Sequence, residues 1–240
     1  MTEKGYANPQ LLIPAEELIR KRDGGSSPMA GDASICIVDA RPTHEYVEGH
    51  IPGAIHLDLY SLSLNDTSEK PFNAFMWMIA YLFQQRGVDA TRTIVWYDNV
   101  SGTRAARGFW LSEYLGHEDV RVLDGGFGAW VAAGGEVSTK AVEPPEVPPF
   151  RTNRRPETHM DADTIHQMLN QDDFAVLDTR TTEEHYGHTA RAARGGAIPD
   201  SIHIEWLNNL DEQGKFKPAS ELRTLYESAG ITPEKHIMCY

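Results

Sequence analysis

The sequence holds few residues that could act as nucleophiles or soft metal ligands. Its two cysteines, Cys36 and Cys239, lie far apart and form no C-x-x-C pair. This count excludes a disulfide framework and a cysteine-rich zinc site, and it favours the reducing cytoplasm as the location. The ten histidines show no spacing typical of a metal site, and the glycine-rich segments lack nucleotide-binding spacing. We therefore expect no metal ion and no other cofactor.

A D-x-R motif occurs twice, each time at the end of a short apolar run. Asp39 and Arg41 follow ICIV, and Asp178 and Arg180 follow AVL. Each motif is followed by a cluster of acidic and aromatic residues, then by a glycine, and then by an I-P-G-A segment in the first copy or an A-I-P segment in the second. Further on, GVDATRTIVWY (87–97) resembles GITPEKHIMCY (230–240), and the interval from motif to tyrosine differs by only four residues between the copies. This internal repeat predicts two domains of similar structure.

Within the repeat, strand and helix patterns alternate. In the first copy, short apolar runs predict strands at 35–38, 93–97 and 120–123, and helical spacing predicts helices at 75–86, 104–115 and 126–133. In the second copy, we expect a helix at 161–169, a strand at 175–177 and a helix at 220–228. Such alternation predicts an α/β fold, with a parallel sheet and helices on both of its faces.

The predicted domain boundaries follow from the repeat and from proline content. Residues 141–157 hold five prolines, which remove backbone donors and disfavour both helices and central strands. We therefore expect an N-terminal segment at 1–30, a first domain at 31–138, a proline-rich linker at 139–158 and a second domain at 159–240.

The charge of the chain limits its partners. The formal net charge of −13 argues against a nucleic-acid surface and against a polybasic membrane anchor. No apolar stretch approaches the roughly 20 residues that span a bilayer, and the first residues do not resemble a signal peptide. A small anionic substrate stays possible, because a basic pocket can exist within an acidic protein. The oligomeric state is not predicted.

Three segments of the first copy resemble signatures of the rhodanese family of two-domain sulfurtransferases. D-A-R…E-Y…G-H-I-P-G-A-I (39–55) resembles the first signature, and L-D-G-G-F-G-A-W (123–130) resembles the later one. The segment 97–110 is similar to the non-catalytic loop of the N-terminal half in this family. The resemblance implies tandem rhodanese-like domains, of which the second is the catalytic type.

The resemblance implies transfer of the sulfane sulfur of thiosulfate to cyanide or a thiol acceptor. In rhodaneses a cysteine opens a loop at a helix N-terminus, where backbone N–H groups and the helix dipole favour the thiolate. The thiolate attacks the outer sulfur, sulfite leaves, and a cysteine persulfide passes its sulfur to the acceptor. The expected partners are therefore a small anionic sulfur donor and a thiol or cyanide.

The position of this nucleophile differs between the two copies. In the first copy it is Asp98, whose carboxylate cannot accept a sulfane sulfur, so this half is expected to be structural. In the second copy it falls directly after Tyr240, where the family places cysteine. We therefore expect the second domain to be incomplete in this sequence, with no catalytic nucleophile present. Cys239 and Cys36 are the weaker alternatives, because we expect both to lie in strands as small buried hydrophobes.

Four polar residues of the second copy are candidates for its site. By analogy with the family, Asp178 and Arg180 form an ion pair that supports the active-site loop. Arg191 and Arg194 lie in an insertion that the first copy lacks, and they could attract an anion or simply form a solvated loop.

Three other functions are compatible with the same residues. A 3-mercaptopyruvate sulfurtransferase would differ in loop residues beyond Tyr240. A catalytically inactive rhodanese-like module would serve as a binding or regulatory scaffold. A phosphatase of the related cysteine–arginine type shares the fold, but tandem copies with one degenerate member are typical of sulfurtransferases.

Overall fold

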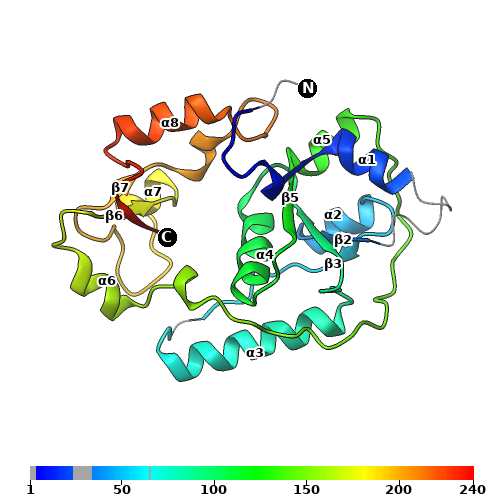
Figure 1. Cartoon of the computed structure of the whole chain (residues 1–240), viewed down its shortest axis with the longest axis horizontal. Helices are drawn as coiled ribbons and strands as arrows, with labels where there is room; N and C mark the ends of the chain where they lie inside the picture. The colour runs from blue at the N-terminus through cyan, green and yellow to red at the C-terminus, as the bar shows by residue number, and fades with distance from the viewer. Residues whose placement is uncertain (1–3, 24–33, 65) are drawn as a thin grey trace. The chain divides into compact units, whose positions relative to one another are not determined.

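The computed structural model describes residues 4–23, 34–64 and 66–240, which form two compact units (Figure 1). We call Asn8–His159 together with Glu212–Phe216 the first unit. We call Met1–Ala7, Met160–Asp211 and Lys217–Tyr240 the second unit. Each is described by itself below.

The first unit is built on a five-stranded parallel sheet in the order β1-β5-β4-β2-β3. In that order the strands are Leu12–Pro14, Val120–Asp124, Thr93–Tyr97, Ile35–Asp39 and Ile55–His56. The central strand β4 is buried from its second residue to its last, because helices cover both faces of the sheet. This explains why its sequence is a continuous apolar run without alternation.

Helices pack on both faces of this sheet, and successive residues of β4 separate the two cores. Ile94 and Trp96 join the core with α3 (Glu69–Gln85) and α4 (Thr103–Tyr114). Val95 and Tyr97 join the core with α1 (Ala15–Asp23) and α5 (Gly126–Ala132). The unit also contains α2 (Thr43–Glu48) and two 3₁₀ helices, η1 (Pro9–Leu11) and η2 (Pro156–Thr158).

Two segments that we set apart from the first domain pack into the first unit. From the segment 1–30, whose residues 1–3 and 24–30 lie outside the described part, Ile13 and Leu18 are fully buried. The sequence does not predict strand β1, because its three residues are too few to show an alternation of apolar and polar residues. From the proline-rich segment 139–158, Phe150 packs against Phe83 with ring centroids 5.3 Å apart. One aromatic side chain thus anchors a segment whose composition suggests only an extended linker.

Helix α3 begins six residues before the predicted start at Phe75. Its apolar periodicity is clear only from that point. Pro71 lies in the first turn of the helix, where its missing N–H has no intrahelical partner to lose.

The second unit contains a three-stranded parallel sheet in the order β7-β6-β8. These strands are Ile202–His203, Phe174–Asp178 and His236–Cys239, and the helices are α6 (Ala162–Met168), α7 (Thr182–His185), α8 (Ala219–Ser228) and η3 (Trp206–Asn209). Strand β6 is buried along its whole length, whereas β8 at the edge of the sheet is largely exposed.

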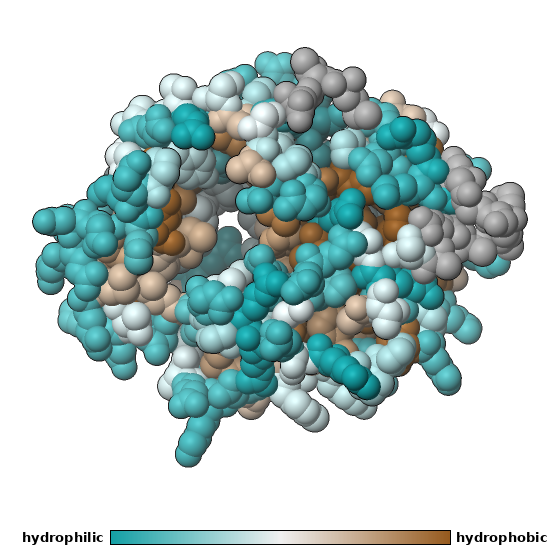
Figure 2. Space-filling view, viewed as in Figure 1, coloured by the Kyte–Doolittle hydropathy of each residue, from teal (hydrophilic) through white to brown (hydrophobic). Residues whose placement is uncertain are grey.

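Polar residues dominate the visible surface. On the face seen in Figure 2, teal hydrophilic residues predominate, and brown hydrophobic residues show in smaller areas between them. Among the described helices, none is both long enough and apolar enough to cross a membrane.

Gly108 allows α4 to pack directly against β4. A Cβ atom at this position would lie 2.7 Å from Cε2 of Trp96 and closer still to two other ring atoms. The Trp96 ring cannot easily move, because it is fully buried and its Nε1 donates to Ser112 Oγ at 3.0 Å. We predict that Gly108→Ala lowers the free energy of unfolding of the first unit by about 1–3 kcal/mol, as measured by urea denaturation.

Gly128→Ala is the matched control, since Gly128 also lies in a helix but its Cβ would meet only Asn99 O at 3.3 Å. We expect this substitution to change the stability by less than about 1 kcal/mol, because alanine also favours the helix. Equal losses for the two variants would contradict the packing argument.

Candidate active site

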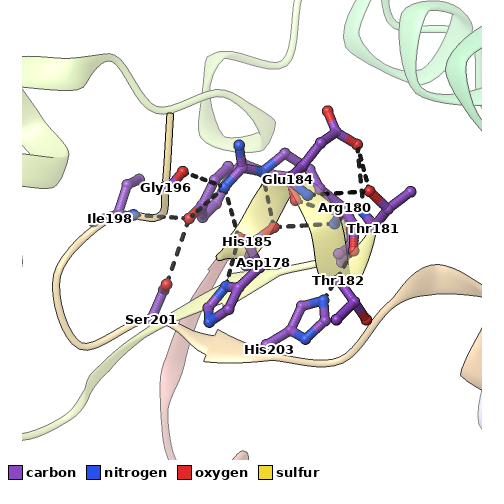
Figure 3. A network of polar contacts seen from close by, with 12 residues as sticks. Asp178, Arg180, Thr181, Thr182, Glu184, His185, Gly196, Ile198, Ser201 and His203 are labelled. Carbon is purple, nitrogen blue, oxygen red and sulfur yellow. Dashed lines mark hydrogen bonds and ion pairs between the residues drawn. The ribbon is translucent and has the colours of Figure 1, made fainter. Parts of the chain in front are cut away.

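A buried carboxylate organises the end of β6 (Figure 3). The side chain of Asp178 is fully buried and contacts two cationic or ionisable side chains. Arg180 Nη2 donates to Asp178 Oδ2 at 2.7 Å and Nε to Oδ1 at 3.0 Å. His185 Nδ1, from the end of α7, lies 2.9 Å from Asp178 Oδ2. The carboxylate therefore joins the strand end to the helix that follows it.

Arg180 also connects this carboxylate to the end of β8. Its Nη2 donates to Gly196 O at 3.0 Å, and its guanidinium lies 4.7 Å from the ring centroid of Tyr240. The hydroxyl oxygen of Tyr240 accepts a hydrogen bond from the amide of Ile198 at 2.9 Å. The cluster thus holds together the end of β6, the segment 196–198 and the end of β8.

The first unit contains the same arrangement around Asp39. Arg41 Nη2 donates to Asp39 Oδ2 at 2.6 Å and to Gly49 O at 2.7 Å. The Tyr97 hydroxyl donates to Asp39 Oδ2 and accepts a hydrogen bond from the amide of Ile51 at 3.2 Å.

Tyr97 and Tyr240 therefore occupy equivalent places in the two units. Tyr97 O accepts a hydrogen bond from the amide of Ala40, and Tyr240 O accepts one from the amide of Thr179. In each case the donor directly follows the buried aspartate, so the register of the two sheets agrees at this point.

The surroundings of Asp178 lower its pKa. Burial alone would raise the pKa of this carboxyl, but the hydrogen bonds from Arg180 and His185 outweigh burial and hold the pKa well below its usual range. Asp178 is therefore ionised throughout the physiological pH range, and the ion pair with Arg180 persists there.

The loop after β4 begins with Asp98, which is buried. Its Oδ1 accepts a hydrogen bond from the amide of Asn99 at 2.8 Å, and its Oδ2 accepts one from the amide of Arg104 at 3.2 Å. Burial raises the pKa of Asp98, an effect that exceeds the opposing contribution of these two amides. The loop thus offers two backbone donors to a side chain at this position, immediately before α4.

The two arginines of the insertion, Arg191 and Arg194, both lie at the surface. Arg191 Nε pairs with Glu184 Oε1 at 2.8 Å, and the Arg191 side chain is 63% exposed. Arg194 is also exposed. The structure thus brings Asp178, Arg180 and Tyr240 into one cluster, and it links Arg191 to α7 through Glu184.

The two cysteines have opposite environments. Cys36 is buried, and burial raises the pKa of its thiol to about 11, which keeps it protonated and a poor nucleophile. The expectation that Cys239 is buried is wrong, because its side chain is exposed. Strand β8 is an edge strand, and among the described residues little covers it.

Sequence reasoning did not single out His185. Its place one residue after Glu184 matches that of Tyr46 after Glu45 in the first copy, but Tyr46 donates to Ala54 O, so the repeat gives no sign of the contact with Asp178. The described residues contain no group of three or more His, Cys, Asp or Glu side chains that could hold a metal ion.

Comparison with known proteins identifies the family. The profile of the rhodanese-like domain matches residues 15–133. The chain is 30% identical to the sulfur carrier protein TtuD of Thermus thermophilus over 98% of its own length and 84% of that protein. The chain belongs to the rhodanese family. The family resemblance of its motifs is therefore confirmed, as is the α/β fold with a parallel sheet flanked by helices.

Other relatives extend this comparison. The rhodanese chain is 28% identical to a thiosulfate sulfurtransferase of Pseudomonas aeruginosa, over 89% of its own length and 79% of the relative. It is similar in structure to the anaerobic ergothioneine biosynthesis enzyme of Chlorobium limicola, with a TM-score of 0.80 and 26% identity over 96% of this chain. The chain spans only 60% of the length of that enzyme.

The lowered pKa of Asp178 predicts an acid-dependent contribution to stability. A carboxyl whose pKa is lower in the folded state than its unfolded value near 4 stabilises the fold above about pH 4, and this contribution is lost as the pH falls further. We predict that Asp178→Asn lowers the free energy of unfolding of the second unit near pH 7 by about 2–3 kcal/mol. The difference from the unmodified protein should shrink as the pH falls to about pH 2.

Thermal unfolding followed by scanning calorimetry over this pH range measures the effect. Asp172→Asn is the control, because Asp172 is an exposed aspartate of the same unit. A loss of stability in Asp178→Asn that does not change with pH would contradict the ionic origin of the effect.

Proposed function

We propose that this protein is a sulfurtransferase that moves the sulfane sulfur of thiosulfate through a cysteine persulfide to cyanide or a thiol. Two observations support the reaction class: relatives named thiosulfate sulfurtransferase and sulfur carrier protein cover most of the chain. These relatives are 28–30% identical to the chain, and the identities of the sulfur donor and the sulfur acceptor are part of this proposal.

The equivalence of Tyr97 and Tyr240 carries the assignment of the site. In the first unit, the residue after the tyrosine is Asp98, whose carboxylate accepts two hydrogen bonds from backbone amides. The corresponding position in the second repeat directly follows Tyr240, and we propose that it holds the catalytic cysteine. The same amide geometry would stabilise a thiolate there and lower the pKa of the thiol.

In the proposed reaction, the thiolate attacks the outer sulfur of thiosulfate and forms a new S–S bond. The sulfur–sulfur bond of thiosulfate breaks, and sulfite leaves with the bonding electron pair. Cyanide or a thiolate then attacks the outer sulfur of the persulfide, and the cysteine thiolate is the leaving group. No external oxidant or reductant is needed when cyanide is the acceptor.

The described residues would support this reaction by position and charge. Asp178 and Arg180 hold the end of β8 through Tyr240, and so they act as positioning residues for the loop that follows. Arg191 and Arg194 would raise the local concentration of an anionic donor. Asp98 makes the first repeat the structural half.

The domain limits 31–138 and 159–240, with a linker at 139–158, and a cytoplasmic location are part of this proposal. A 3-mercaptopyruvate sulfurtransferase is the alternative within the same chemistry, and an inactive rhodanese-like binding module is the alternative outside it. The assay below distinguishes them, since only the inactive module transfers sulfur from neither donor.

We predict that the full natural protein produces thiocyanate from thiosulfate and cyanide, and that replacement of the cysteine after Tyr240 by serine abolishes this activity. Cys36→Ser and Cys239→Ser should retain most of it. Mass spectrometry after incubation with thiosulfate should locate one additional sulfur atom on the peptide that follows Tyr240.

The 240-residue chain provides the complementary control and is expected to form no thiocyanate. Loss of activity in Cys239→Ser, or sulfur found on a peptide with Cys36, would overturn the assignment of the nucleophile. Activity with 3-mercaptopyruvate but not with thiosulfate would select the alternative donor.

We further predict that, in the full natural protein, the double substitution of Arg191 and Arg194 by glutamine raises the KM for thiosulfate by about 2- to 10-fold and leaves kcat nearly unchanged. Arg223→Gln is the control, because this exposed arginine of α8 pairs only locally, with Glu227 at 3.3 Å. Steady-state kinetics at low salt measure the difference. A KM equal to that of the control would show that the insertion is a solvated loop.

A further inference from the structure

Helix α3 of the first unit carries a largely apolar stripe on its exposed side (Figure 1). Its other side is buried in the core of that unit. Five exposed residues occupy the positions i, i+3, i+4, i+7 and i+11 of the helix: Ala74, Trp77, Met78, Tyr81 and Gln85. This spacing places them in one line along a helix. We call these five residues the α3 stripe.

Two aromatic rings form a flat platform in the middle of the α3 stripe. The side chain of Trp77 is 66% exposed and that of Tyr81 is 53% exposed. Their ring centroids lie 5.9 Å apart, and the ring planes differ by only 6°. Tryptophan, tyrosine and methionine are enriched in the centres of protein interfaces. Because the two rings already hold each other in place, little side-chain freedom is lost when another surface packs on them.

The α3 stripe lies on an uncharged segment. From Pro71 to Gln85 the sequence contains no Asp, Glu, Lys or Arg. The other described helices of nine or more residues, α1, α4 and α8, all carry charged residues along their length. The chain as a whole has a net charge of −13, so two copies of it repel each other in most orientations. An uncharged face is where two such copies can approach at the least electrostatic cost, and it offers no charge by which to select a charged partner.

The α3 stripe is also complementary to itself. When two copies of a helix pair antiparallel about a two-fold axis, residues at the same level have sequence numbers with a constant sum. With the axis between Trp77 and Met78, the small Ala74 of one copy lies opposite the large Tyr81 of the other, at both ends of the contact. Trp77 and Met78 of the two copies then meet at the axis, where contacts between a thioether and an aromatic ring are favourable.

We propose that the α3 stripe is the interface of a symmetric homodimer, in which the α3 helices of two copies pack antiparallel with the two-fold axis between Trp77 and Met78. The exposed parts of Trp77, Met78 and Tyr81 in two copies amount to roughly 700 Å², since a whole aromatic side chain buries about 150–250 Å². This area is below the ~1,200 Å² at which stable interfaces begin, even before the rim is counted. We therefore expect a weak dimer with a Kd in the micromolar range.

Sedimentation velocity of the full natural protein, over a range of about 1–200 µM, tests the association. We expect the fraction of dimer to rise with concentration. Trp77→Lys should weaken the association at least about tenfold, because it places a charge at the centre of the interface. Val131→Lys is the matched control, since Val131 is an exposed apolar residue of another helix of the same unit, α5, and this variant should associate like the unmodified protein.

Tryptophan fluorescence supplies a second measurement. Trp77 is the most exposed of the five tryptophans, so its emission should shift to longer wavelength when dilution separates the dimer. A full protein that stays monomeric at about 200 µM would overturn the proposal, whether further chain or a different protein then covers the α3 stripe. Association that is as strong in Trp77→Lys as in the unmodified protein, or weakened equally by Val131→Lys, would also overturn it.

Disulfide cross-linking tests the antiparallel register. Ala74→Cys and Tyr81→Cys are prepared as separate proteins, each with Cys239→Ser and with serine at the position after Tyr240. Under mild oxidation, the mixture should form covalent dimers, whereas either protein alone should form few. Equivalent positions would lie about 10 Å apart along the helix axis, beyond the reach of a disulfide.

A mixture that cross-links no better than the separate proteins would overturn the register. These measurements need no sulfur donor, so they succeed or fail independently of the proposed reaction.

Discussion

The structure depends on a buried carboxylate that each repeat places at the end of a parallel strand. A buried carboxylate without partners costs several kcal/mol, so its position must supply donors at once. The D-x-R motif does this within three residues: the amide of Arg41 donates to Asp39 Oδ1 at 2.9 Å, and the Arg41 guanidinium binds the same carboxylate. Nη2 of the same guanidinium also donates to a loop carbonyl, that of Gly49. The motif therefore determines where the following loop returns to the sheet.

The two repeats complete this arrangement with different third partners. In the first unit, Asp39 accepts a hydrogen bond from Tyr97, and Arg41 is covered by the Phe127 ring at 3.9 Å from the ring centroid. In the second unit, His185 takes the place beside Asp178, and its ring stacks on His203 at 4.4 Å between centroids. A common backbone frame thus places a tyrosine hydroxyl beside one carboxylate and an imidazole beside the other, while an arginine pairs with each of them.

The parts of the fold that could be predicted are those where burial leaves a local pattern. Strands such as Thr93–Tyr97 are covered on both faces, so they appear as continuous apolar runs, and the repeated motif aligned Tyr240 with Tyr97. Features that depend on distant packing left no such pattern. Phe150 anchors a proline-rich segment through contacts far along the chain, and Cys239 is exposed because its strand lies at an edge.

The loop after β4 shows how neighbouring groups can occupy backbone donors that precede a helix. In the first unit, its amides are already committed: those of Asn99 and Arg104 bind the Asp98 carboxylate, and that of Ser101 binds Gly214. Backbone donors arranged in this way can stabilise an anion only when neighbouring chain does not occupy them. An aspartate at the head of the loop satisfies two of these donors from within. These three amides of the first unit are therefore occupied by groups of the chain itself and do not serve a further anion.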